Sequence, residues 1–170
     1  MSAKDELELL RARARRLAEP AQTLGLDDDR AHLIVFTRGQ AQYALDVTYV
    51  REVLPLTEYA IVPFAPPACL GISAARGELL AVFDLAALGG EVPREPPSLM
   101  LRCGEPAHEL VLAIDHAVDL VAKAPLQPAP ADHEGPVLGL DARGFLVLDG
   151  EALLTDPRFT IDPQQSETNP

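Results

Sequence analysis

Residues 70–84, LGISAARGELLAVFD, and residues 138–149, LGLDARGFLVLD, look like two copies of one structural unit. Each copy has an apolar run, an Ala-Arg-Gly turn and a second apolar run that ends at an aspartate, Asp84 or Asp149. Glycine suits tight turns, and aspartate suits the position that caps the first turn of a helix. The repeat therefore predicts two similar β-lobes, each ending in a short capped helix.

Strand patterns continue on both sides of the first copy. Residues 32–38 and 42–46 are two runs separated by Gly39 and Gln40, which predicts a hairpin. Residues 50–56 and 59–63 are expected to continue this meander, and residues 79–83 are expected to be buried on both faces of a sheet. Further strands are expected at residues 99–102, 109–114, 118–123, 137–140 and 145–148, with a Pro-rich loop over 125–136. These runs predict a mainly β fold with short helical turns.

The start of the chain is patterned differently. Leu7, Leu10, Ala14 and Leu17 form one apolar stripe, which predicts a helix over residues 2–18 that ends before Pro20. The helix either docks on a surface or remains a solvated extension. We expect three regions: an N-terminal helix and acidic linker over 1–30, a body over 31–159, and a polar tail over 160–170. The two lobes of the body are expected at about residues 31–90 and 98–159.

Composition excludes several classes of protein. The net charge is -12 over 170 residues, which argues against binding to nucleic acid or to an anionic membrane surface. No run approaches the ~20 apolar residues that a membrane span needs, so we expect no membrane insertion and a cytoplasmic protein. Cys69 and Cys103 have no metal-binding context and are expected to be reduced thiols. We expect no cofactor and no metal.

The sequence gives little support to an enzyme. His32, His108, His116 and His133 do not have the spacing of metal ligands, and there is no Gly-rich phosphate loop. Asp84 and Asp149 hold equivalent positions in the repeat, where helix capping explains both carboxylates without acid–base chemistry. We therefore expect an interaction protein.

The first half of the chain resembles a known family. Glu52-Val53, Ala65-Pro66-Pro67, Gly71-Ile72, Arg76-Gly77 and Phe83-Asp84-Leu85 occur together in the order and spacing of the CheW-like coupling proteins of bacterial chemotaxis. The likeness extends from about residue 32 to residue 159. The same pattern also resembles the regulatory domain of the partner kinase. It implies two small five-stranded, SH3-like β-barrel lobes packed together, with the N-terminal helix as an addition.

The resemblance also implies a function. Members of this family are non-catalytic adaptors that join the regulatory domain of a CheA-type histidine kinase to the cytoplasmic tip of a chemoreceptor. One lobe pairs with a barrel of the kinase, and a groove between the lobes holds the receptor. By motif position, the partner-binding residues expected here are Val50, Glu52, Val53, Gly71, Arg76 and Gly77.

One position departs from the family pattern. Ala74-Ala75 stands where the family usually has Asn-Leu before Arg-Gly. This departure, the added helix and the acidity favour an alternative, in which the chain is a diverged CheW-fold module of a signalling pathway other than chemotaxis.

Two charged residues lie among apolar neighbours in the candidate site. Arg76 and Glu52 must each reach water or find a partner, because an unpaired buried charge costs several kcal/mol. We hypothesise that they form an ion pair that fixes the loop of residues 71–77 in the shape a partner recognises. The alternative is an ion pair that only braces the lobe. Gly71, Gly77 and Gly144 are expected to serve positive φ angles or close backbone contacts, and the strand of residues 50–54 is a candidate sheet edge.

Overall fold

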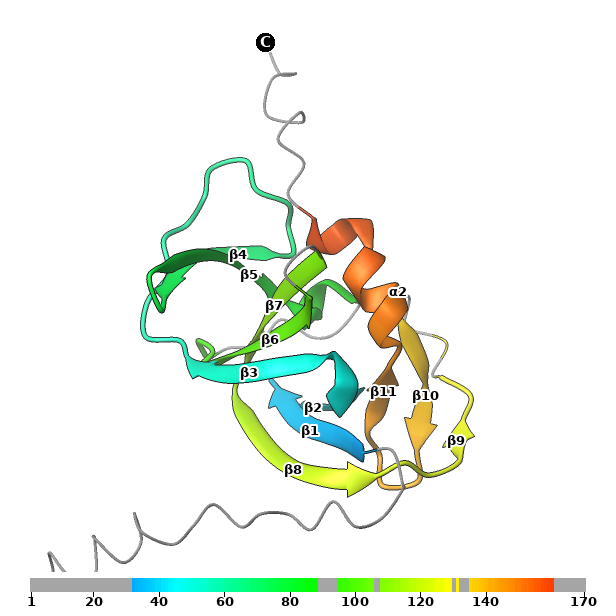
Figure 1. Ribbon diagram of the computed structural model, residues 1–170. Coiled ribbons are helices and arrows are strands. Elements are labelled where there is room, and N and C mark those ends of the chain that lie inside the picture. Colours follow the sequence, from blue (N-terminus) through cyan, green and yellow to red (C-terminus); the bar gives the residue numbers. More distant parts are fainter. Residues whose placement is uncertain (1–31, 89–94, 106–107, 130, 132–134, 161–170) are drawn as a thin grey trace, which may run out of the picture. The chain divides into compact units, whose positions relative to one another are not determined.

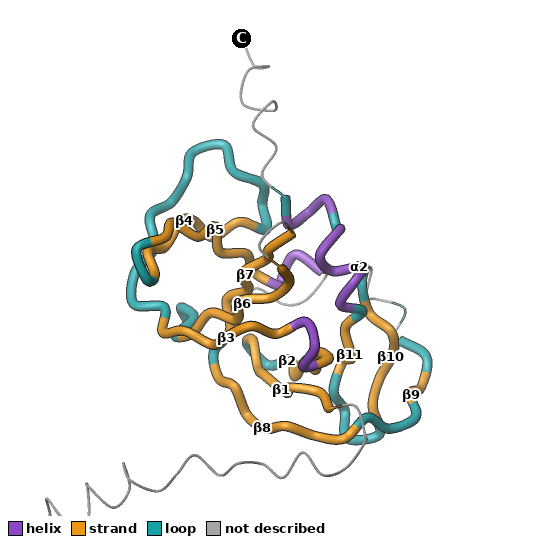
Figure 2. The backbone as a smooth tube through the Cα atoms, in the orientation of Figure 1, coloured by secondary structure: helices purple, strands orange, loops and turns teal. Residues whose placement is uncertain are grey.

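The computed structural model describes residues 32–88, 95–105, 108–129, 131 and 135–160. The expected N-terminal helix and acidic linker, and the tail beyond Thr160, lie outside the described residues. Within the described part, the chain is mainly β, with a few short helices (Figures 1 and 2). No helix there is long and apolar enough to cross a membrane.

Eleven strands form two sheets in the described part of the chain. The six-stranded sheet has the order β8-β1-β2-β11-β10-β9, with bounds β1 His32–Arg38, β2 Ala41–Asp46, β8 His116–Ala122, β9 Leu126–Gln127, β10 Val137–Asp141 and β11 Leu146–Leu148. The five-stranded sheet has the order β3-β6-β7-β5-β4, with bounds β3 Val50–Pro55, β4 Cys69–Ala75, β5 Glu78–Asp84, β6 Leu99–Glu105 and β7 His108–Ile114. Short helices connect or follow them: η1 Val47–Tyr49, η2 Leu85–Leu88, α2 Gly150–Thr155 and η3 Pro157–Phe159. The expected mainly β fold with short helical turns is confirmed, while the SH3-like barrel form of each lobe stays a prediction.

The local elements agree with the sequence patterns. β1 and β2 form the expected hairpin, and Gly39 adopts a φ of 62° at its turn. Both aspartates of the repeat cap a helix, because Asp84 accepts from the backbone N–H of Ala86 and Asp149 from that of Ala152. The Ala-Arg-Gly turns join β4 to β5 and β10 to β11, so the two copies of the unit fold alike.

The two sheets do not follow the expected division near residue 90. β3 follows β2 in the chain but pairs with β6, and β8 follows β7 but pairs with β1. In addition, β5 pairs in parallel with β7, and β11 pairs in parallel with β2. Each half of the chain therefore supplies strands to both sheets. The local pattern that identifies a strand does not specify a distant pairing partner, so the exchange could not be read from the repeat.

Two smaller expectations also differ from the structure. Residues 59–63 form no strand and contribute only a bridge between Ala60 and Ile72. β5 is not buried on both faces along its length, because Leu79 is 77% exposed while Val82 and Phe83 are buried. Its first residues pair with β4 alone, and only its second half lies between β4 and β7.

One hydrophobic core joins the two sheets. Phe36, Tyr43 and Leu45 of the six-stranded sheet pack with Leu101 and Leu112 of the five-stranded sheet in a single buried cluster. Each sheet also has a smaller cluster of its own. Burial of aliphatic side chains stabilises this arrangement at roughly 1.5–3 kcal/mol for each fully buried large residue. The shared core holds the sheets as one compact body.

Candidate functional site

The residues expected to bind a partner all lie on the five-stranded sheet. β3 carries Val50, Glu52 and Val53, β4 carries Gly71, and the turn from β4 to β5 carries Arg76 and Gly77. Within the described residues β3 pairs only with β6, so the prediction that residues 50–54 form a sheet edge is confirmed. Val50 packs against the shared core, whereas Val53 is partly exposed.

Glu52 and Arg76 form the expected ion pair. The Nη2 atom of Arg76 lies 2.9 Å from Oε2 of Glu52, and the Arg76 side chain is 69% exposed. Arg76 and Gly77 have φ angles of 51° and 80° in a two-residue hairpin turn, which is the pattern of a type I′ turn. A left-handed φ is unfavourable for arginine, so this turn carries a cost in backbone strain. The turn places the Arg76 side chain in solvent.

Arg102 completes this group, although nothing in its sequence context indicates this role. Its guanidinium donates two hydrogen bonds to Glu109, from Nε to Oε1 at 2.6 Å and from Nη2 to Oε2 at 2.9 Å. It also donates to Glu78 at 2.7 Å and to Glu52 at 3.2 Å. We call Glu52, Arg76, Glu78, Arg102 and Glu109 the sheet-face cluster. Hydrogen bonds from Arg102 to Glu109 and then to Glu78 raise the pKa of Arg102 above its ordinary value.

The charge of the sheet-face cluster is nearly balanced. Three carboxylates against two guanidiniums leave one negative charge, and no single ion pair accounts for the arrangement. Arg102 stands directly opposite Glu52 in the register of β3 and β6. Without knowledge of that pairing, Arg102 looks like one polar residue in an apolar strand, which is why sequence reasoning missed it.

Gly71 is required by a close backbone approach. Its φ is 152°, and a Cβ atom there would lie 2.3 Å from the carbonyl oxygen of Ala60. Ala60 and Ile72 exchange two backbone hydrogen bonds, at 2.8 and 2.9 Å, across this contact. The expectation of positive φ or close approach is confirmed for Gly71, and positive φ also occurs at Gly77 and Gly144.

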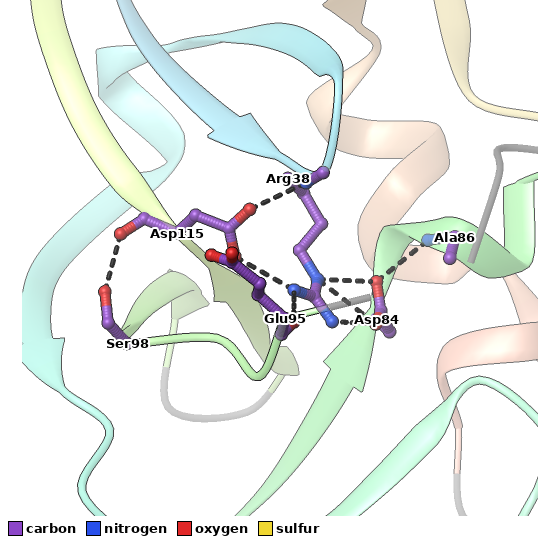
Figure 3. Close-up of polar contacts among 7 residues, drawn as sticks. Arg38, Asp84, Ala86, Glu95, Ser98 and Asp115 are labelled. Carbon is purple, nitrogen blue, oxygen red and sulfur yellow. Dashed lines mark hydrogen bonds and ion pairs between the residues drawn. The ribbon is translucent and has the colours of Figure 1, made fainter. Parts of the chain in front are cut away.

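A second ionic group lies where the two sheets meet. Arg38, at the end of β1, lies between Asp84 and Asp115 (Figure 3). Its Nη2 is 2.6 Å from Asp84, and its Nη1 is 2.9 Å from Asp115 and 3.1 Å from the carbonyl oxygen of Glu95. We call Arg38, Asp84 and Asp115 the junction cluster. Asp84 thus has a second task besides the capping that the sequence predicted.

The junction cluster is fully satisfied. Asp115 also accepts from the backbone N–H of Gly39 at 2.7 Å, and no buried side-chain N or O atom in the described residues lacks a hydrogen-bond partner. Burial alone lowers the pKa of Arg38, but the hydrogen bonds and charges of Asp84 and Asp115 outweigh it and raise that pKa. This cluster joins the two sheets, because Arg38 belongs to the six-stranded sheet and Asp84 to the five-stranded sheet.

The described residues outside these two clusters include two cysteines and one cavity. No group of three or more His, Cys, Asp or Glu among them could hold a metal ion. Cys69 and Cys103 are free thiols, as expected, and burial raises the pKa of Cys103 to about 12. A cavity of about 240 Å³ beside the six-stranded sheet is lined mainly by apolar residues, including Leu33, Tyr49 and Leu148.

Known proteins with sequences or folds similar to this chain agree with one another. A probable chemotaxis protein CheW of Rhizobium etli is 28% identical over 142 residues, covering 77% of this chain and 92% of the relative. The chemotaxis protein CheW of Rhizobium meliloti is 27% identical over 140 residues, covering 78% and 88%.

A solved structure shares the fold. The crystal structure of the scaffolding protein TtCheW from Thermoanaerobacter tengcongensis superposes with a TM-score of 0.61 at 18% identity, covering 73% of this chain and 87% of that one. The sequence pattern that defines the CheW-like domain matches residues 32–158, which include both sheets and the sheet-face cluster. The chain therefore belongs to the family of CheW-like domain proteins.

Proposed function

We propose that this protein is a non-catalytic adaptor of a chemosensory pathway. It joins the regulatory domain of a CheA-type histidine kinase to the cytoplasmic tip of a chemoreceptor, and it acts in the cytoplasm. The observation that carries the proposal is the ion pair between Glu52 and Arg76, with 2.9 Å between Oε2 and Nη2. The resemblance implies that these two residues occupy positions at which the family contacts its partners.

The five-stranded sheet offers two features suited to a partner. β3 is an edge strand, and an edge strand can extend by pairing with a strand of another barrel. The sheet-face cluster lies beside that edge and holds Arg76 in solvent, where a carboxylate of the partner can reach it. Charges at the rim of an interface contribute mainly to specificity and association rate. The apolar contacts around Val53 would supply the affinity.

Weak single contacts are sufficient for such an adaptor. A protein that engages a kinase and a receptor at once gains from effective concentration, because the second contact becomes intramolecular. The junction cluster and the shared core keep the two sheets as one body, so that partners bound to each are held at a fixed separation.

A diverged interaction module is the second candidate. Ala74 and Ala75 precede Arg76, where the family usually has Asn-Leu, so the usual asparagine is missing from the strand beside Arg76. Loss of that side chain favours a partner other than the usual receptor.

Reconstitution separates the two candidates. The protein is mixed with a CheA-type kinase and with receptor-containing membranes, and autophosphorylation of the kinase is measured with and without receptor ligand. The adaptor function predicts that the protein makes kinase activity respond to the ligand and that Arg76→Glu abolishes the response. Leu138→Asn, a change on the six-stranded sheet, serves as the matched control. If the response of kinase autophosphorylation to receptor ligand is the same with and without this protein, the adaptor function is contradicted and the diverged module is favoured.

A further inference from the structure

The loop between β3 and β4, residues 56–68, presents two apolar side chains to solvent. Phe64 is 97% exposed and Ile61 is 81% exposed, the highest values among the large hydrophobic residues that the structure describes. The loop arches away from the five-stranded sheet (Figure 1). An isolated exposed apolar residue is ordinary, but two in one loop that include a fully exposed aromatic ring indicate an interaction site.

The backbone at Phe64 is strained. The N–H of Ala65 donates to the carbonyl oxygen of Val62, which closes a four-residue turn with Pro63 second and Phe64 third. Phe64 has a φ of 62°. Proline second and a positive φ third define a type II turn, whose third position is normally glycine or asparagine. Phenylalanine at this position is unfavourable for stability, so its presence calls for a functional reason.

The loop is held rigidly on both sides of that turn. Leu56 N–H donates to the Ser98 carbonyl at 2.9 Å, and the Ser73 hydroxyl donates to the Glu58 carbonyl at 2.8 Å. Ala60 pairs with Ile72 over Gly71, and Cys69 N–H donates to the Pro66 carbonyl at 2.8 Å. Prolines at positions 63, 66 and 67 reduce the freedom of the chain further. A loop backbone fixed in this way loses little entropy when a side chain that it carries binds.

The charge pattern indicates what the loop contacts. No Asp, Glu, Lys or Arg occurs from Tyr59 to Ala75, although charged residues make up 24% of the chain. An uncharged apolar knob matches an apolar pocket on a protein. A bilayer surface fits less well, because a chain with a net charge of -12 is repelled by anionic lipids and this loop offers no cation to offset that repulsion.

We propose that Phe64, assisted by Ile61, is an anchor residue that inserts into an apolar pocket on the kinase regulatory domain. This inference rests on the proposed function and adds an anchor to it, because the loop connects the edge strand β3 to β4, which carries Gly71. The strained turn conformation would then be kept because it presents the aromatic ring to the partner.

The test compares Phe64→Asn with Phe64→Leu. Asparagine suits the left-handed position and removes the apolar surface. We therefore expect Phe64→Asn to raise stability and to weaken binding. The Tm rises by about 2–4 °C as strain is relieved, and the Kd for the isolated kinase regulatory domain, measured by calorimetry, rises about tenfold or more. Phe64→Leu keeps strain and apolarity and is expected to bind within about threefold of the wild type. Leu138→Asn, an exposed apolar residue on the other sheet, is the control and is expected to leave the Kd unchanged.

Several outcomes would overturn the proposal, and they can be told apart. If the wild type binds the regulatory domain, Arg76→Glu weakens binding and Phe64→Asn does not, the anchor is wrong while the adaptor function stands. If the wild type does not bind the regulatory domain, both fail. If Phe64→Asn instead abolishes co-sedimentation with phosphatidylserine vesicles, or self-association in sedimentation velocity, with binding to the regulatory domain intact, the loop serves a membrane or a second copy.

Discussion

The junction cluster and the sheet-face cluster use the same chemistry in different surroundings. In the junction cluster, Arg38 is buried, with 4% of its side chain exposed, and each of its three side-chain nitrogens donates to an acceptor. In the sheet-face cluster, the side chains of Arg76 and Glu78 are exposed, whereas those of Arg102 and Glu109 are mostly buried. We propose that this difference in burial separates a structural group, the junction cluster, from a recognition group, the sheet-face cluster.

Arg38→Met gives the largest expected effect on stability. It leaves Asp84 and Asp115 without their guanidinium between the two sheets, and breaking a buried pair in this way costs about 3–5 kcal/mol. The free energy of unfolding is measured by urea titration with circular dichroism. Lys123→Met, which removes a half-exposed ammonium from the partly exposed Asp46, is the control with the smaller loss. Equal losses in the two variants would remove the distinction that burial makes.

Gly71→Ala tests the backbone beneath the candidate surface. A Cβ atom 2.3 Å from the Ala60 carbonyl oxygen forces the loop of residues 56–68 to move, and we expect a loss of about 2–3 kcal/mol. Gly77→Ala meets no neighbour within 4 Å and should lose only the left-handed strain, about 1 kcal/mol. The same urea titration compares the two. A milder effect at Gly71 than at Gly77 would show that the close approach is not needed.

Arg102→Met separates the two clusters by their response to salt. Three glutamates are left facing one another on the sheet surface, so stability falls most at low ionic strength and the loss shrinks as salt is added. Thermal unfolding is compared at about 0.01 M and about 1 M ionic strength, where the Debye lengths are roughly 30 Å and 3 Å. The loss in Arg38→Met should hardly change between these conditions. A salt-independent loss in Arg102→Met would place it with the structural group.

Asp141→Asn gives the smallest expected effect, a loss of stability near neutral pH that disappears in acid. A hydrogen bond from Arg143 holds the pKa of Asp141 below its ordinary value in the folded state. The pair therefore stabilises the fold above the unfolded pKa, and this contribution is lost as the pH falls through the lower folded pKa, below about pH 4. Unfolding midpoints measured from about pH 6 down to about pH 2 should fall less steeply in Asp141→Asn than in the wild type. Identical slopes would show that Asp141 does not contribute to acid sensitivity.

Local features of the fold could be predicted from the sequence. The hairpin of β1 and β2 has a turn glycine between two alternating runs, and Asp84 and Asp149 stand where helix caps are needed. The pairing of Glu52 with Arg76 was predicted because each charged residue stands among apolar neighbours in the sequence and needs a partner. These features depend on residues close in sequence or on a known pattern.

Features that depend on distant pairing could not be predicted. The exchange of β3 and β8 between the sheets is set by long-range contacts that leave no local signal. The role of Arg102 follows from that exchange, because its partner Glu52 arrives on β3. Arg38 was hidden for the same reason, since Asp84 and Asp115 lie 46 and 77 residues away in the chain. The strained turn at Phe64 required the backbone angle, which composition alone does not reveal.

A double-mutant cycle on Glu52 and Arg76 tests the central claim, that the exposed ion pair serves recognition. Glu52→Gln, Arg76→Gln and the double variant are scored separately for the free energy of unfolding and for affinity to the kinase regulatory domain. We expect a coupling energy of at least about 1 kcal/mol in binding and less than about 0.5 kcal/mol in stability. Coupling that is found in stability, with binding intact in all three variants, would contradict the account and make the pair a brace of the lobe.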